Sequence, residues 1–238
     1  MLNKLLFIFL LTVIYNYENI YAQSSLKGGD TDTSINKINE KGQKTGKWIK
    51  KYNNGQIRYE GYFYNDRPYG NFKYYYDNGK LKSEVQYIST DDTTKLCYAK
   101  FYSEYGKILA EGYYKSEKKD SIWRYYNEDG ILIIEERYKD FVKHGKSYVF
   151  FSNGNISQET NWNKGIQDGA MKEYYPNGTI SYYCNYINGK IEGKAYGYYD
   201  TGQKRVEGKY INSMKDSTWI YYNENGTIKR TVVYKKGD

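Results

Sequence analysis

The residues of this sequence that could perform chemistry are glutamates that recur at one fixed spacing. Each stands five residues after a glycine, at Glu60, Glu84, Glu111, Glu135, Glu159 and Glu207. Glycoside hydrolases use a pair of carboxylates, one as an acid and one as a nucleophile or base. Six copies at the same position of a repeated unit are better explained by the repeat than by an active site. We therefore predict no catalytic residue and a protein that is not an enzyme.

Other reactive side chains are few. His144 is the only histidine, and because a general base also needs a positioned partner, a structural role is favoured. The two cysteines, Cys97 and Cys184, lie about three repeats apart, or roughly 29 Å at ~4.8 Å per strand, which is too far for a disulfide. The sequence has no Cys/His spacing typical of metal sites and no phosphate-binding loop. We therefore predict neither a metal nor a cofactor.

The element that must position these residues is a repeat of about two dozen residues. Its marker is a turn glycine, found at Gly55, Gly79, Gly106, Gly130, Gly154, Gly178, Gly202 and Gly226. Successive glycines are 24 residues apart, except for one interval of 27 that contains the polar segment Ser89–Thr94. Each glycine separates two short runs of alternating side chains, which is the pattern of a β-hairpin. The sequence predicts an all-β fold, an elongated single-sheet antiparallel β-meander solenoid of about eight hairpin repeats.

One face of this sheet is predicted to be buried. If Asn78–Gly79 is a two-residue turn, Tyr76 lies opposite Leu81, and side-chain alternation continues that face to Tyr87. The predicted buried face then has three columns: Tyr52, Tyr76, Tyr102, Tyr126, Phe151, Tyr175, Tyr199, Tyr222; Ile57, Leu81, Ile108, Leu132, Ile156, Ile180, Lys204, Ile228; and Phe63, Tyr87, Tyr114, Tyr138, Trp162, Tyr186, Tyr210, Tyr234. The turns at Gly106, Gly130 and Gly226 have one extra residue before the glycine, and a bulge is expected there.

The opposite face, which we call the glutamate face, carries the six glutamates. An aromatic column is predicted beside them, formed by Tyr75, Phe101, Tyr125, Phe150, Tyr174, Tyr198 and Tyr221. Cross-strand aromatic and charged pairs of this kind stabilise a sheet by ~0.2–1 kcal/mol each. The face is exposed to water yet lined with rings, so we predict that these aromatic residues and the glutamates form the binding face.

The N-terminal segment, residues 1–22, is typical of a secretory signal peptide. Lys4 precedes an apolar run from Leu5 to Ile14, and Ala22 offers a cleavage site before Gln23. An N-terminal membrane anchor or a buried strand stays open as an alternative. Residues 23–41 are polar and predict a flexible lead-in, and residues 42–238 form the repeat domain. We therefore expect a secreted or periplasmic protein.

The composition bounds the classes of partner. The sequence has 33 tyrosines, 23 glycines, only 2 prolines and a formal net charge of +8. Tyrosine-rich strands favour sheets that are wet on one side over helices. The charges alternate along the strands instead of clustering, which is typical of a solvated face. Because export is expected, no nucleic-acid binding is predicted. The positive charge leaves open a module that binds anionic lipid or anionic polysaccharide.

Several segments resemble the MORN repeat, which reads Tyr-Glu-Gly-x-Trp/Phe followed by x-x-Gly-Lys-x-x-Gly. The first part is matched by Tyr59-Glu60-Gly61-Tyr62-Phe63, and the second part by Lys143-His144-Gly145-Lys146 and Asn188-Gly189-Lys190-Ile191-Glu192-Gly193. The Tyr-Tyr-x-Asn-Gly corner is more similar to the bacterial MORN repeat variant of YwqK-type antitoxin-component proteins. The resemblance covers residues 42–238. Thr160 and Cys184 depart from its glycine column, and Tyr183 replaces a glutamate.

These observations lead to one functional expectation with two alternatives. We expect an exported, non-enzymatic repeat protein that acts as a protein-binding or scaffolding module at the bacterial cell envelope, with another protein or an envelope component as its partner. The resemblance implies an alternative, an antitoxin-like partner that neutralises a toxin. The charge motivates the other, a module for anionic lipid or polysaccharide. Association with a membrane surface and oligomerisation through the uncovered terminal strand are also left open.

Overall fold

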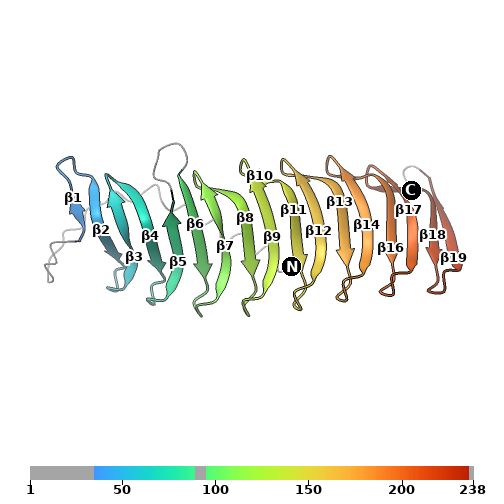
Figure 1. Cartoon of the computed structure of the whole chain (residues 1–238), viewed down its shortest axis with the longest axis horizontal. Helices are drawn as coiled ribbons and strands as arrows, with labels where there is room; N and C mark the ends of the chain where they lie inside the picture. Colours follow the sequence, from blue (N-terminus) through green and yellow to red (C-terminus); the bar gives the residue numbers. More distant parts are fainter. Residues whose placement is uncertain (1–34, 89–94, 236–238) are drawn as a thin grey trace. The chain divides into compact units, whose positions relative to one another are not determined.

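The computed structural model describes residues 35–88 and 95–235, and their regular secondary structure is entirely β (Figure 1). The strands are β1 (Lys37–Ile38), β2 (Lys44–Lys51), β3 (Ile57–Tyr64), β4 (Arg67–Tyr75), β5 (Leu81–Tyr87), β6 (Leu96–Tyr102), β7 (Ile108–Lys115), β8 (Lys118–Tyr126), β9 (Leu132–Lys139), β10 (Val142–Lys143), β11 (Gly145–Phe150), β12 (Ile156–Asn163), β13 (Ile166–Tyr174), β14 (Ile180–Ile187), β15 (Lys190–Ile191), β16 (Gly193–Tyr198), β17 (Lys204–Ile211), β18 (Met214–Tyr222) and β19 (Ile228–Tyr234).

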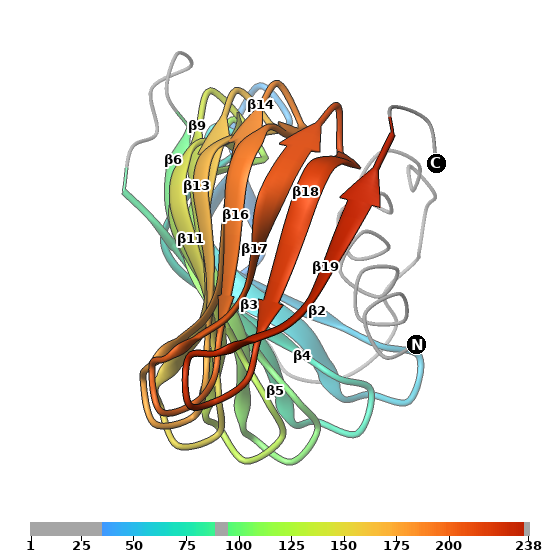
Figure 2. The same cartoon turned by 90° about the vertical axis from the view of Figure 1, so that its right-hand side faces the viewer.

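These nineteen strands lie in one open antiparallel sheet, and their pairing follows the order of the chain. Both β10 and β11 pair with β9, and both β15 and β16 pair with β14, so each couple is one strand with an interruption. Eight hairpins result, one for each turn glycine, and the predicted single-sheet meander is confirmed. Seen along the row of strands, the strands bend and the sheet twists from β2 to β19 (Figure 2).

The N-terminal predictions fall mostly outside the described residues. The signal peptide (residues 1–22), residues 23–34 of the lead-in and the segment Ser89–Thr94 belong to the ranges that the structure does not describe. Ile35 forms a bridge with Lys47, and β1 pairs with β2, so β structure begins ahead of residue 42. Among the described residues, no helix has the length and apolar character needed to cross a membrane.

The turn at each marker glycine differs from the prediction in its register. The Gly79 N–H donates to the Tyr76 carbonyl (3.0 Å), and the Tyr76 N–H donates to the Lys80 carbonyl (2.8 Å). This is a type I turn with a glycine bulge, in which Gly79 adopts a φ of 83°. Leu81 therefore pairs with Tyr75 and not with Tyr76. The expected two-residue turn was wrong because the bulge takes one more residue.

All eight marker turns share these two hydrogen bonds, so the extra residue expected at three of them does not exist. Ser103, Asn127 and Asn223 occupy the turn position that is aromatic in the other five repeats. The Ser103 and Asn127 side chains accept hydrogen bonds from backbone N–H groups of their own turns. The backbone of these three turns is the same as in the others, but their aromatic residues stand one position earlier in the sequence. The predicted columns were misaligned for this reason.

A second bulge follows each turn, and it changes the face of the sheet on which the side chains next to the turn lie. Tyr74 pairs with Ser83 while Tyr75 pairs with Leu81, so Lys82 is an extra residue. Because one added residue reverses the alternation, Leu81 lies on the glutamate face although Ser83 is buried on the other. The aliphatic column predicted as buried therefore belongs to the glutamate face. The same register shift recurs in the other seven hairpins, for example opposite Phe101/Tyr102 and Tyr125/Tyr126.

The face opposite the glutamates, which we call the core face, holds the buried residues. Its most deeply buried rings, Phe72, Trp123 and Trp219, are 1%, 0% and 2% exposed. Each lies flat on a glycine of the preceding strand, at Gly61, Gly112 and Gly208 respectively. The third predicted column stands on this face: the Tyr114 ring centroid lies 4.7 Å from that of Trp123, and the Tyr210 centroid 5.1 Å from that of Trp219. A sheet without a second layer buries its core in this way.

The core face is divided into two hydrophobic clusters. The first contains Ala99, Ala110, Tyr114, Trp123 and Tyr125, and the second contains Met171, Cys184, Ala195, Val206 and Trp219. Between them, Glu136 occupies the glycine position of its repeat and is 8% exposed. It forms an ion pair with Lys143 and accepts a hydrogen bond from the Tyr138 hydroxyl (2.7 Å). A buried charge is tolerated there because it is fully paired.

The two terminal edges of the sheet are finished differently. At β2, the Asn36 N–H donates to the Lys47 carbonyl (2.8 Å), and the Asn36 side-chain oxygen accepts from the Ile49 N–H (2.8 Å). At the other end, β19 pairs with β18 alone among the described strands. The first edge is thus capped by the chain itself, whereas no strand of the described residues pairs with the outer edge of β19.

Candidate binding face

The central row of the glutamate face alternates in charge from strand to strand. Cross-strand pairing places side by side, in this order, Glu60, Lys73, Glu84, Lys100, Glu111, Arg124 and Glu135. Ion-pair distances are 4.0 Å for Lys73–Glu84, 3.8 Å for Lys100–Glu111 and 3.0 Å for Arg124–Glu135. Neighbouring residues in such a row stabilise each other because opposite charges stand directly opposite.

Tyrosine hydroxyls hold the same carboxylates from the next hairpin. Tyr75 donates to Glu60 (2.6 Å) and Tyr102 donates to Glu84 (2.8 Å). Tyr126 donates to Glu111 (2.7 Å), and Tyr222 donates to Glu207. Each of these tyrosines stands four residues before its turn glycine. In these four cases a tyrosine of one hairpin fixes the carboxylate of the hairpin before it.

These contacts shift the acidity of both partners. Burial, and then the hydrogen bond to a glutamate, raises the pKa of Tyr75, Tyr102 and Tyr126 to about 12. For Glu111, burial raises the pKa, but the hydroxyls of Tyr126 and Tyr98 and the neighbouring cations outweigh it and lower the pKa overall. Ionised carboxylates and neutral phenols are therefore the stable pair at neutral pH.

The structure separates the aromatic residues predicted for this face into two groups. Tyr75, Phe150, Tyr174 and Tyr198 lie on the glutamate face, where they pair with Leu81, Ile156, Ile180 and Lys204. Phe101, Tyr125 and Tyr221 lie on the core face instead. Tyr125 is buried, Phe101 stacks near Trp123 at 6.3 Å between ring centroids, and Tyr221 packs against the second cluster. Their true equivalents are Tyr102, Tyr126 and Tyr222.

All six predicted glutamates lie on one face, but their cationic partners were missed. Lys73, Lys100 and Arg124 each stand six residues before a turn glycine. This fixed distance from the glycine is the sequence signal that would have identified them. The position is less regular beyond Glu135, because it is held by Tyr148, Lys172, Tyr196 and Ile220 in the later repeats. Charge alternation is thus a property of β3 to β9.

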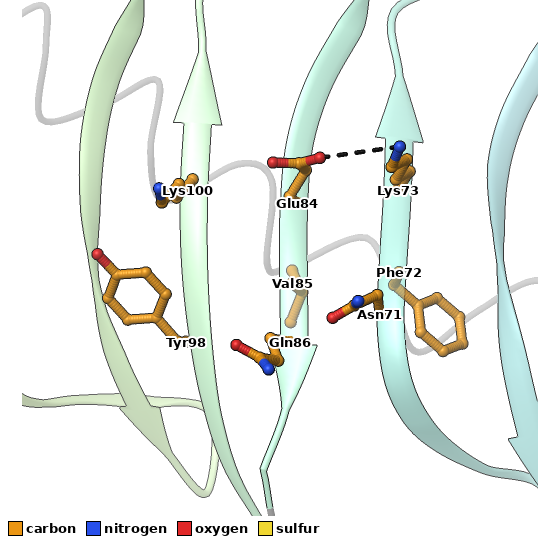
Figure 3. A pocket seen from close by; sticks show the side chains of 8 residues that line it. All are labelled: Asn71, Phe72, Lys73, Glu84, Val85, Gln86, Tyr98 and Lys100. Carbon is orange, nitrogen blue, oxygen red and sulfur yellow. Dashed lines mark ion pairs between the residues drawn. The ribbon is translucent and has the colours of Figure 1, made fainter.

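A shallow hollow of about 170 Å³ lies on this face over β4, β5 and β6 (Figure 3). Its polar lining comes from Asn71, Lys73, Glu84, Gln86, Tyr98 and Lys100. In the close view, the Lys73 ammonium points toward the Glu84 carboxylate, and Lys100 stands on the other side of it. The hollow was not foreseen, because it depends on the register between three strands.

The other residues considered for chemistry stand apart from this hollow. His144 uses its backbone N–H to bond the Arg137 carbonyl (2.9 Å) at the interruption between β10 and β11. Cys97 and Cys184 are both free, as predicted, and burial raises the pKa of each thiol to about 11. In the described ranges, no three His, Cys, Asp or Glu residues gather as a metal site.

The fold and this face define a protein built from stacked β-hairpin repeats with one patterned, solvent-facing surface. The model of the MORN repeat variant family matches residues 44–66, 68–89, 119–140, 143–164, 167–188, 191–212 and 215–236. These matches cover more than half of the sequence, and the chain belongs to that family. The hairpin β6–β7 lies between two of the seven matches, yet it has the same turn and register as the others. No curated protein matches the chain.

Proposed function

We propose that this protein is an exported, non-enzymatic binding and scaffolding module that holds another protein or a component of the bacterial envelope against its glutamate face. The observation that supports it most is the charge row from Glu60 to Glu135. Its carboxylates are engaged by cations and phenols, so they are poorly suited to exchange protons with a substrate. They are well suited to present a fixed pattern of charge.

A fixed pattern favours recognition because little side-chain entropy remains to be lost when a partner binds. The alternation also selects the partner: a surface with the opposite order of charges pairs along the row, and a shifted one meets like charges. Because the charges sum to nearly zero along the row, binding depends on register more than on net attraction. This favours a specific protein or envelope component over a general polyanion.

Site-specific photo-cross-linking in the source cell tests the proposal. A photo-reactive residue at Lys73, on the charge row, should give one defined adduct. The control position is Tyr105, which is 90% exposed at a marker turn away from the row. The adduct from position 73 should disappear when Lys100→Glu breaks the alternation. Equal adducts from both positions, or an adduct that survives Lys100→Glu, would contradict the proposal.

Export and the narrower antitoxin role are tested with the same protein. If the signal peptide is cleaved after Ala22, the mature chain begins at Gln23 and is recovered outside the cytoplasm; an uncleaved chain in the cytoplasm contradicts export. The resemblance to YwqK-type proteins motivates a toxin as the partner. In that case the adduct from position 73 contains a toxic protein whose effect on growth is relieved by co-expression of this chain.

A further inference from the structure

The hollow over β4, β5 and β6 carries side chains whose hydrogen-bonding groups are not used by the protein. Asn71 and Gln86 stand directly opposite each other on β4 and β5, and both side chains are exposed. Within residues 35–88 and 95–235, neither carboxamide makes a side-chain hydrogen bond. Each offers two N–H donors and one carbonyl acceptor. The hollow can therefore bond a ligand that both donates and accepts.

An aromatic wall stands beside these carboxamides. Tyr98 on β6 is the cross-strand neighbour of Gln86, and Tyr113 on β7 is the neighbour of Tyr98. The centroids of the two rings are 4.8 Å apart, with the rings inclined at 53°. A hydrogen bond between the Tyr98 hydroxyl and Glu111 helps to fix the ring. A second ring pair, Tyr62 and Tyr69, lies over β3 and β4 with centroids 5.8 Å apart.

These groups form a row that crosses the strands at regular intervals. Asn71, Gln86, Tyr98 and Tyr113 come from four consecutive strands, and adjacent strands are ~4.8 Å apart. A pyranose ring in an extended β-1,4-linked chain advances by about the same distance. Successive sugars could thus meet a carboxamide or a ring at each strand. Hydroxyl groups satisfy the carboxamides, and the apolar C–H face of a sugar covers a tyrosine ring.

We propose that the hollow is a binding site for a linear β-1,4-linked glycan that lies across β4 to β7. The proposal names a ligand for one part of the glutamate face, and so rests on the proposed function that this face binds. Asn71 and Gln86 hydrogen-bond the sugar hydroxyl or acetamido groups, and Tyr98 and Tyr113 support the ring faces. The Lys73–Glu84 and Lys100–Glu111 pairs border the site with balanced charge, so an uncharged chain is accommodated. A purely apolar ligand would leave both carboxamides without partners.

Calorimetric titration of the full chain with cellohexaose and with chitohexaose tests this site. We expect at least one hexasaccharide to bind, and the comparison shows whether acetamido groups are needed. Gln86→Ala and Tyr98→Ala should each weaken binding by about tenfold or more. Because Gln86 is exposed, its replacement reads out binding even if Tyr98→Ala disturbs the fold. The matched control is Asn185→Ala, at the same repeat position in β14, which should leave the affinity unchanged.

Two outcomes overturn the inference. One is a wild-type chain that binds neither hexasaccharide; if position 73 still cross-links to a protein partner, the proposed function stands and the glycan site alone fails. The other is a loss of affinity in Asn185→Ala as large as that in Gln86→Ala, which would place binding outside the hollow. Retained glycan binding without any cross-linked partner would instead remove the protein-scaffolding role and leave this site in place.

Discussion

The indole ring of Trp123 lies directly on the backbone of Gly112 in the neighbouring strand. A Cβ atom at Gly112 would be 2.5 Å from the ring atom Cδ2, which is closer than real contacts allow. The indole N–H also donates to the Tyr113 carbonyl (2.8 Å), one residue beyond the glycine. Ring and glycine therefore form one unit, and the same unit recurs as Phe72 on Gly61 and Trp219 on Gly208.

Replacement of Gly112 by alanine should destabilise the protein. Alanine in a strand normally stabilises relative to glycine by ~0.5–1 kcal/mol. Here the added methyl displaces the Trp123 ring, and overpacking costs ~1–3 kcal/mol. Chemical denaturation of Gly112→Ala should therefore show a lower free energy of unfolding. Thr160→Ala, at the same repeat position but without a ring above it, should change that free energy less. A stabilised Gly112→Ala variant would contradict the packing.

Replacement of Ser121 by glycine should stabilise the protein. Ser121 has a φ of 57°, in the left-handed region that is costly for residues with a Cβ. The equivalent position in β11 is Gly145, with a φ of 83°. Removing the Cβ should raise the free energy of unfolding by ~1 kcal/mol. Thermal denaturation measures this change. Ser83→Gly, at a buried strand position without a positive φ, should instead lower the midpoint of thermal denaturation. A lower midpoint for Ser121→Gly as well would show that the backbone at Ser121 is not strained.

Stability should fall at high pH as the tyrosines that hydrogen-bond the glutamates ionise. The pKa of Tyr75 is raised from 10.0 to about 12 in the folded state, so the folded chain holds its phenolic protons more tightly than the unfolded chain. The stabilisation is complete below pH 10 and is lost as the pH rises from about 10 to about 12. Denaturation midpoints measured across this range should decline less steeply in Tyr75→Phe. Tyr105→Phe, at a side chain that is 90% exposed, is the control.

Stability should also fall at low pH through the carboxylates of the charge row. The pKa of Glu111 is lowered in the folded state by its phenol and cation partners, against the effect of burial. A lowered folded pKa gives stabilisation that is present above the unfolded value of 4.5 and is lost as the pH falls through the folded value. Glu111→Gln should therefore lower the free energy of unfolding at neutral pH and make it depend less on pH in the acidic range. Glu224→Gln, at an exposed turn, should keep the wild-type dependence on pH. If Glu111→Gln kept it too, the carboxylate of Glu111 would not be stabilised by its neighbours in the charge row.

The hairpin repeat was readable from the sequence because its signals are local. The 24-residue spacing of glycines such as Gly79 predicts the turns, and the column containing Tyr114 and Tyr210 was correctly expected to be buried. The face of Leu81 could not be read in the same way, because two bulges around each turn change the alternation. Tyr125 was assigned to the wrong face for a related reason: Asn127 replaces an aromatic residue in its turn and shifts the apparent alignment.

The binding face was only partly predictable. Glu111 and its five equivalents share a fixed distance from the glycine, so their common face follows from the repeat. Their partners depend on register, since Lys100 is brought beside Glu111 by cross-strand pairing and Tyr126 reaches it from the following hairpin. The hollow depends on three strands at once. Such relationships arise from the packing of neighbouring hairpins and have no signature in a single repeat.

The unequal ends of the described sheet limit how two molecules can join through their strands. Asn36 already occupies hydrogen-bonding positions beside β2, so a strand from another molecule is hindered there, while the outer edge of β19 has no strand partner among the described residues. Chains that join through their edges would meet β19 to β19, around a two-fold axis. Such a contact consumes both free edges at once, so edge-to-edge association would stop at a pair and would not run on into a fibre.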